Sequence, residues 1–270
     1  MSEARRIAFI GGGNMARSLI GGIVAAGGGK TAVTVADPDA GQREAFAGMT
    51  GVETTADNAA AVAGAGLVVL AVKPQIAPRA LESVAPVLAR ERPLLISIAA
   101  GLRIERIEDA AGAELPVVRA MPNTPALVKR GVSAFFANDR VERAGRRVAR
   151  EVLEAVGTVI EVDEEAQLDA VTAVSGSGPA YFFLLVEALA DAAAAAGLPA
   201  ETAARLAAGT GIGAMALLDE SGEPPARLRE RVTSPGGTTA AALDVFAEGD
   251  LRGLVRRAVL RARERAEELS

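Results

Sequence analysis

The residues best suited to chemistry lie in two glycine-rich loops, one near each end of the chain. Residues 233–239, TSPGGTT, combine four hydroxyl side chains, a proline and two glycines, and an alanine-rich helix is expected directly after them. Glycines let backbone N–H groups converge, and a helix N-terminus adds unpaired donors at the positive end of its dipole. Such a loop can bind a small anion without a charged side chain. The alternative is an ordinary turn in which a threonine caps the second helix.

The second loop, residues 11–16 with the sequence GGGNMA, follows the apolar run 7–10 and precedes a stretch with helical periodicity. This order of strand, glycine-rich turn and helix is the context that the dinucleotide fingerprint G-x-G-x-x-A requires. In that motif Gly11 makes the tight turn, Gly13 lets the backbone approach a pyrophosphate, and Ala16 allows the helix to pack closely on the strand. An ordinary glycine-rich turn is the alternative, and the flanking elements favour the nucleotide site.

The next expected strand does not fix which cofactor binds. It is followed by Asp37, and an acid at this position commonly accepts a hydrogen bond from the ribose 2′-hydroxyl of NAD. Arg43 lies on the helix that follows and could bind the 2′-phosphate of NADP, or could be a solvated surface charge. Both cofactors therefore stay open at this point.

Three more segments follow expected strands, at the carboxyl ends where open α/β sheets bind ligands. They are 71–74 (AVKP), 99–101 (AAG) and 119–125 (RAMPNTP). Lys73 is one of only three lysines in a chain that otherwise uses arginine, so it is a candidate for contact with cofactor or substrate, with a surface lysine as the alternative. In the third segment two prolines stiffen a loop that presents Asn123 and Thr124 at the end of a strand.

These loops need a scaffold, and roughly the first 160 residues alternate short apolar runs with helical stretches. That order predicts an α/β fold with a mostly parallel, doubly wound sheet of the Rossmann type and helices on both of its faces. Continuous apolar runs such as 67–71 and 94–98 are typical of strands buried on both sides. Strands are expected at 7–10, 32–36, 67–71, 94–98, 117–119, 132–136 and 159–162, and helices at 15–26, 40–47, 75–89, 104–111 and 142–156.

Beyond residue 163 the strand signal stops, and the spacing of apolar residues is helical. The chain is therefore divided into a dinucleotide-binding Rossmann domain, 1–163, and an all-α domain, 164–270. Alanine-rich helices of this kind can pack closely against a partner copy. The expected helices are 167–174, 181–196, 201–218, 225–232, 240–247 and 251–269.

Composition narrows the function further. A formal net charge of −5 argues against nucleic acid or an anionic membrane as the main partner. The absence of cysteine removes thiol catalysis, and the absence of histidine removes the commonest general acid–base and metal ligand, so no metal is expected. No apolar run before Gly11 fits a secretory leader, and the longest uncharged stretch, 170–186, is interrupted by SGSGP. We expect a soluble cytoplasmic protein.

Together these motifs resemble those of pyrroline-5-carboxylate reductase, the last enzyme of proline biosynthesis. The matching segments span nearly the whole chain in the family's order. They are GGGNMA (11–16), AVKP (71–74), SIAAG (97–101), RAMPNTPALV (119–128), DAVTAVSGSGPAYFFLLVEALADAAAAAGLP (169–199) and SGEPPARLRERVTSPGGTTAAAL (221–243). The resemblance implies reduction of 1-pyrroline-5-carboxylate to L-proline with NADPH, and often also NADH. It further implies that the helical domain binds substrate and interlocks with a second subunit, giving a homodimer or a ring of dimers.

The resemblance also assigns roles by motif position. It implies that Thr239 hydrogen-bonds the ring nitrogen of the substrate as the catalytic residue, while neighbouring backbone N–H groups hold the carboxylate. The substrate-binding residues would be Ser234, Gly237, Thr238 and Thr239. The cofactor-binding residues implied by motif position would be Gly11, Gly13, Asn14, Met15, Ala16, Asn58, Ala71, Val72, Lys73, Pro74, Ala100 and Asn123, and Asp37 joins them from its place after the second expected strand. The Asp37 region varies among such enzymes, so it does not decide between NADPH and NADH.

The residue types favour an imine substrate independently of the resemblance. Reduction of a carbonyl needs a proton donor for the developing alkoxide, but no lysine follows Lys129 and the chain has no histidine. A cyclic imine that arrives as an iminium ion is already electrophilic, so positioning and exclusion of water suffice. A β-hydroxyacid-type dehydrogenase and a dinucleotide-binding regulator without turnover are the alternatives. Tyr181, the only tyrosine, is either a proton donor or, as we favour, a packing residue at a dimer interface.

Overall fold

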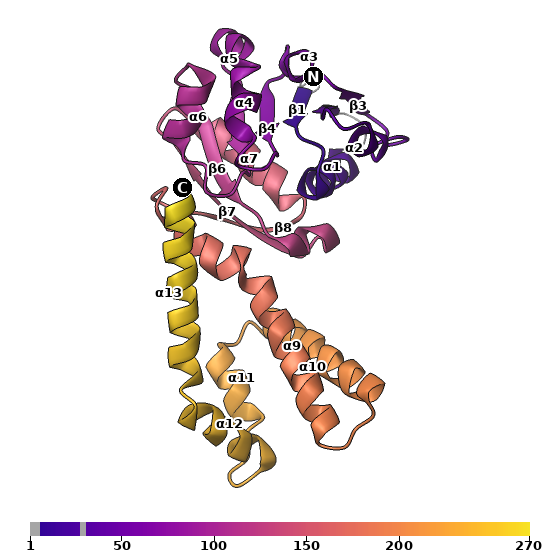
Figure 1. Cartoon of the computed structure of the whole chain (residues 1–270), viewed down its shortest axis with the longest axis vertical. Coiled ribbons are helices and arrows are strands. Elements are labelled where there is room, and N and C mark those ends of the chain that lie inside the picture. The colour runs from indigo at the N-terminus through magenta and orange to yellow at the C-terminus, as the bar shows by residue number, and fades with distance from the viewer. Residues whose placement is uncertain (1–5, 28–30) are drawn as a thin grey trace. The chain divides into compact units, whose positions relative to one another are not determined.

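The computed structural model describes residues 6–27 and 31–270; residues 1–5, on which the expectation of no secretory leader partly rests, lie outside the described residues. The chain divides into two compact units (Figure 1). The first comprises Met1–Ser177 together with Ala262–Ser270, and the second comprises Gly178–Arg261. The sequence places its boundary at 163/164 instead. The short helix after the last strand and the last nine residues of the chain therefore group with the sheet.

The first unit is built on one eight-stranded sheet in the order β3-β2-β1-β4-β5-β6-β7-β8. All neighbouring strands are parallel except β6 and β7, which are antiparallel. The strands are β1 (Arg6–Ile10), β2 (Ala32–Ala36), β3 (Val52–Thr55), β4 (Leu67–Leu70), β5 (Leu94–Ser97), β6 (Val117–Met121), β7 (Gly131–Ala137) and β8 (Gly157–Glu161). The order reverses between β1 and β4, the switch point at which open α/β sheets bind ligands. The predicted doubly wound sheet is confirmed.

Helices cover both faces of this sheet, as predicted. They are α1 (Asn14–Gly27), α2 (Ala40–Glu44), α3 (Asn58–Val62), α4 (Ala77–Glu82), α5 (Ala85–Glu91), α6 (Ile104–Ala111), α7 (Arg143–Glu154) and α8 (Gln167–Val171), with the helical turns η1 (Thr124–Val128) and η2 (Thr172–Gly176). Successive strand residues point to opposite faces. On β1, Ile7 and Phe9 therefore enter one apolar core with residues of α1 and α7, while Ala8 and Ile10 enter a second core with residues of α4 and α6.

Three local differences from the sequence expectation have physical causes. The sequence does not predict β3 or α3, because an edge strand of four residues and a helix of five are too short to show a period. The helix expected at 75–89 is divided into α4 and α5, since Pro86 has no N–H to donate and its ring clashes with the preceding turn. The helix expected at 167–174 ends as α8 and continues as the π-helical turn η2.

The second unit is helical throughout, as predicted. It contains α9 (Gly178–Ala195), α10 (Ala200–Ser221), α11 (Pro225–Arg231), α12 (Thr238–Glu248) and most of α13 (Leu251–Leu269). Helices α9 and α10 pack against each other (Figure 1). Their buried residues are small, Gly178, Ala203 and Ala207, whereas large apolar side chains such as Phe182 and Phe183 stay exposed. An apolar surface of this extent indicates a partner.

Candidate functional site

Gly11 ends the first strand and turns the chain into the loop 11–13. Its φ of +101° is one that L side chains rarely adopt, and a Cβ here would lie 2.7 Å from the carbonyl oxygen of Ala71. Its N–H donates to the carbonyl of Ala36 at 2.7 Å. The loop is thus held between the ends of β2 and β4, where the sequence predicts the pyrophosphate of a dinucleotide.

Gly13 provides open space at the same loop. No atom lies within 4 Å of the position that a Cβ would take, so a ligand can approach the backbone. Helix α1 begins at the next residue, Asn14, whose Oδ1 accepts a hydrogen bond from Arg17. Ala16 is buried and Met15 packs against the core, which fixes the start of the helix on the sheet. A helix N-terminus with a glycine and open space before it fits a pyrophosphate.

Asp37 and Arg43, the two candidates for reading the 2′ position of the cofactor, come together after β2. The Oδ2 of Asp37 accepts from the N–H of Gly12 at 2.8 Å, and Oδ1 accepts from the N–H of Asp39 at 2.9 Å. The Nη1 of Arg43 donates to the carbonyl oxygens of Asp37 and Pro38 at 2.7 and 3.0 Å. The carboxylate of Asp37 therefore holds in place the loop 11–13, called the phosphate loop below after its predicted ligand, a role that the sequence does not reveal. The carboxylate also keeps lone pairs that can accept from a ribose hydroxyl.

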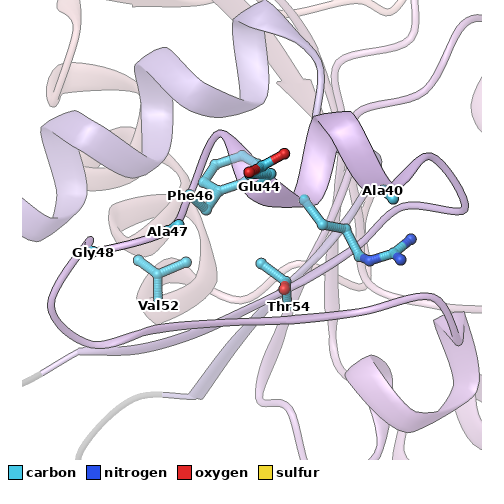
Figure 2. A pocket seen from close by; sticks show the side chains of 8 residues that line it. Ala40, Glu44, Phe46, Ala47, Gly48, Val52 and Thr54 are labelled. Carbon is cyan, nitrogen blue, oxygen red and sulfur yellow. The ribbon is translucent and has the colours of Figure 1, made fainter.

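A shallow hollow of about 430 Å³ lies between α2 and β3 (Figure 2). The side chains of Glu44 and Phe46 lie on one side of it, and those of Val52 and Thr54 lie on the other. Its lining residues are Ala40, Arg43, Glu44, Phe46, Ala47, Gly48, Val52 and Thr54. Arg43 is the one residue that this hollow shares with the candidates for cofactor binding.

The other cofactor candidates lie in loops at the carboxyl edge of the sheet. Residues 71–74 follow β4, and within them Lys73 is exposed. Its carbonyl accepts hydrogen bonds from the N–H groups of Ile76 and Ala77, at the turn that leads into α4. Ala100 follows β5 and is also exposed. Asn58 begins α3, and its Nδ2 donates to the Oγ of Ser83 at 3.2 Å. The side chain of Lys73 thus remains available to a ligand, whereas that of Asn58 already has a partner.

Asn123 differs from these candidates because it is buried, with 8% of its surface exposed. Both ends of its amide are engaged. Its Nδ2 donates to the carbonyl of Ser175 at 3.0 Å, and its Oδ1 accepts from the N–H of Val132 at 2.8 Å. One side chain therefore joins the turn after β6, the start of β7 and the π-turn η2.

A buried ion cluster in the first unit was missed by sequence reasoning. Arg119 on β6, 3% exposed, pairs with Glu165 at 3.1 Å and with Asp169 at 3.3 Å. Asp169, 2% exposed, also lies 3.6 Å from Arg103 and accepts from the Oγ of Ser270 at 3.2 Å. A buried arginine needs carboxylate partners. The arginine inside the apolar run VVRAM indicates a buried charge that needs partners. Its carboxylate partners lie far away in the sequence, so the local sequence does not identify them.

The segment TSPGGTT lies in the second unit, where it connects α11 to α12 and includes the first two residues of α12, and most of it is exposed. Gly236 has φ of +71°, and the N–H of Gly237 donates to the carbonyl of Ser234 at 3.0 Å. The Oγ1 of Thr233 donates to the carbonyl of Arg229 at 2.6 Å. The N-cap of α12 is Gly237, and no side chain caps the helix. The capping threonine considered from the sequence is therefore wrong.

The first turn of α12 begins with Thr238 and Thr239 and contains no acidic residue. Its leading N–H groups lack intrahelical acceptors by helix geometry. With two hydroxyls on the same turn, the helix start offers hydrogen bonds to a carboxylate and to a polar atom next to it. Within residues 6–27 and 31–270, no group of three or more acidic, histidine or cysteine side chains is placed to hold a metal ion.

Two family models match the chain. One describes pyrroline-5-carboxylate reductase dimerisation and matches residues 165–269; the other describes NADP oxidoreductase, coenzyme F420-dependent, and matches residues 6–101. A curated relative, the pyrroline-5-carboxylate reductase of Pseudomonas aeruginosa, is 48% identical over 265 residues, covering 98% of this chain and 97% of the relative.

Solved structures agree with these matches. A pyrroline-5-carboxylate reductase from Coxiella burnetii superposes with a TM-score of 0.93 at 41% identity, covering 99% of both chains. The pyrroline carboxylate reductase of Plasmodium falciparum with NADP bound superposes with a TM-score of 0.83 at 30% identity, covering 99% of this chain and 98% of that one. The likeness extends over both units of the chain.

Proposed function

The chain belongs to the pyrroline-5-carboxylate reductase family, and on this premise we propose that Thr239 is its catalytic residue. The enzyme reduces 1-pyrroline-5-carboxylate to L-proline, with NADP(H) as its cofactor. Hydride adds to the carbon of a C=N bond in this reaction. The observation that carries the assignment of the substrate loop is the start of α12, which has no side-chain cap and bears two adjacent threonine hydroxyls.

The pyrophosphate of the cofactor would be held by the loop 11–13 and the N-terminus of α1. The open space at Gly13 supports this, because a ligand can approach the backbone there. The ribose at the adenosine end would lie at Asp37. When bound, the cofactor supplies the hydride. The other residues proposed to line its site are Gly11, Asn14, Met15, Ala16, Asn58, Ala71, Val72, Lys73, Pro74 and Ala100.

The substrate carboxylate would accept hydrogen bonds from the first N–H groups of α12, at the positive end of the helix dipole. Ser234, Gly237 and Thr238 would form the rest of the carboxylate site. The hydroxyl of Thr239 would then hydrogen-bond the ring nitrogen. A hydroxyl both donates and accepts, so Thr239 can hold the nitrogen as an iminium before the transfer and as an amine after it.

This chemistry needs no histidine. The substrate binds as an iminium ion whose nitrogen already carries its proton. When the hydride forms a C–H bond, the π electrons of C=N move to nitrogen, and a neutral secondary amine results. What the protein must supply is position, with the reacting atoms about 3–3.5 Å apart and water excluded. A threonine hydroxyl and backbone donors are sufficient for that.

We further propose that residues 164–270 act as one domain for substrate binding and dimerisation. The dimerisation model, matched over 165–269, supports this. By length and composition the helical stretch Gln167–Ala195 is also apolar enough to cross a membrane, but a second copy of the chain would cover the same apolar side chains. The enzyme would then be a cytoplasmic homodimer or ring of dimers without nucleic-acid or membrane partners, in keeping with its net charge of −5.

One assay tests this function. Purified protein is mixed with 1-pyrroline-5-carboxylate and either NADPH or NADH, and the absorbance of the reduced nicotinamide is followed. We expect substrate-dependent oxidation, and the ratio of the two values of kcat/KM gives the cofactor preference. Oxidation of neither cofactor would contradict the proposal. Binding of NADPH without turnover would instead support a regulator.

A further inference from the structure

We propose that Asn123 is a positioning residue that holds the π-turn η2, and that it does not bind the cofactor. The turn is defined by an unusual hydrogen bond, in which the N–H of Ser177 donates to the carbonyl of Thr172 at 2.8 Å, five residues back. Such turns are rare inside helices and are frequent at functional sites. The inference rests on the reduction of 1-pyrroline-5-carboxylate by this chain.

The sequence SGSGP explains why the turn needs an outside donor. In a regular α-helix the carbonyl of Ser175 would accept from the N–H of residue 179. Residue 179 is proline, which has no N–H. The Nδ2 of Asn123 donates to this carbonyl at 3.0 Å and takes the place of the missing backbone donor.

Asn123 can hold the turn because it is itself fixed. Its Oδ1 accepts from the N–H of Val132 at 2.8 Å, which ties it to the start of β7. The neighbouring residue Met121 packs close to the same turn: a Cβ on Gly176 would lie 2.5 Å from the Cε of Met121. The loop after β6 and the turn η2 are therefore fixed together at the carboxyl edge of the sheet.

The turn is the last segment before the chain enters the second unit at Gly178, and the second unit carries the substrate loop. A misplacement of about 1 Å can slow a positioned reaction by roughly 100-fold. The proposed cofactor residues lie elsewhere, in the loops and first helical turns after β1, β2, β3, β4 and β5. We therefore expect the loss of the Asn123 donor to lower turnover while NADPH binding is preserved.

The variant Asn123→Asp tests this directly, because aspartate keeps the acceptor for Val132 and replaces the donor to Ser175 by an acceptor. We expect kcat to fall roughly tenfold or more, because a misplaced group slows a positioned reaction, while the Kd for NADPH, titrated without substrate, changes less than about twofold. Thr158→Val, at an exposed residue of β8, should change neither quantity. A roughly tenfold rise in the Kd for NADPH with unchanged kcat would overturn the proposal and make Asn123 a cofactor contact.

A second variant tests whether the effect passes through the Ser175 carbonyl. Pro179→Ala restores a backbone N–H that can donate to this carbonyl, so Asn123→Ala, which places no carboxylate beside Ser175, should cost roughly tenfold in kcat in the parent enzyme and less than about threefold in that background. An equal loss in both backgrounds would overturn the proposal. If Asn123→Ala alone fails to fold, the two backgrounds are compared by folding instead. Recovery of soluble protein with a higher Tm in Asn123→Ala/Pro179→Ala supports the proposal, and no recovery overturns it. Turnover by the unaltered enzyme tests the proposed function separately.

Discussion

The two glycine-rich loops that open α1 and α12 are held in different ways. The loop at Gly11 lies between neighbouring strands, its N–H groups are bonded to Ala36 and to the carboxylate of Asp37, and a side chain at residue 11 would meet the backbone of Ala71. The loop at Gly237 makes its backbone hydrogen bonds within the loop and to the end of α11. Neither α11 nor α12 has a buried residue.

This difference separates two kinds of chemistry. In the first loop the fold itself sets the backbone. The N–H groups of Gly11 and Gly12 are bonded within the protein, and the N–H groups of Gly13 and the first turn of α1 are proposed to bind the pyrophosphate. In the second loop the first N–H groups of α12 are proposed to hold the substrate carboxylate, and the reacting nitrogen depends on a side chain, the hydroxyl of Thr239. Substitutions in the first loop should therefore change cofactor binding, and also stability where a new side chain would meet the backbone, whereas substitutions in the second loop should change turnover and leave the fold intact.

The largest contrast in stability should come from two arginines in different units. Arg119→Met leaves two carboxylates without their buried partner, which should lower the free energy of unfolding by about 3–5 kcal/mol. Arg227→Met removes an exposed pair with Glu230, worth less than about 1 kcal/mol. Urea unfolding of both variants measures the difference. Equal losses would show that the cluster around Arg119 does not stabilise the first unit.

Two glycines of the phosphate loop should respond differently to the same substitution. Gly11→Ala forces a side chain into a φ of +101° and against Ala71, so it should cost about 1–3 kcal/mol of stability and weaken NADPH binding. Gly13→Ala meets no atom of the protein, so stability should be unchanged while the Kd for NADPH rises roughly tenfold. Thermal unfolding and NADPH titration report both effects. Normal NADPH binding by Gly13→Ala would place the pyrophosphate elsewhere.

The sequence predicted most of the sheet because its strands are long apolar runs. It missed β3, whose residues Val52–Thr55 are half exposed and carry no such run. The phosphate loop was predicted correctly in its structure, since glycines between a strand and a helix have few other uses. The brace from Asp37 to Gly12 and the ion pairs of Arg119 could not be predicted, because they join residues distant in sequence through contacts that only the folded chain defines.

Thr239→Val tests the second loop, where the side chain is expected to carry the chemistry. Valine is nearly isosteric, so the half-exposed site should fold normally, while kcat/KM for 1-pyrroline-5-carboxylate should fall roughly 100-fold, a size seen when one oriented donor at a reacting group is lost. Thr239→Ser keeps the hydroxyl and should retain most activity. Steady-state kinetics with saturating NADPH measures both. Unchanged activity in the valine variant would move the ring-nitrogen contact to another residue.

Arg43 is an exception among the proposed cofactor contacts of the first unit. Its side chain, and not a backbone group, would discriminate between NADPH and NADH. If its guanidinium reaches the 2′-phosphate, Arg43→Ala should lower kcat/KM with NADPH roughly tenfold and that with NADH less than about twofold. Arg79→Ala, at an exposed arginine on α4, is the matched control. Arg43 also donates to the carbonyls of Asp37 and Pro38. Equal losses with both cofactors would therefore show that Arg43 holds the loop after β2 in place and does not select the cofactor.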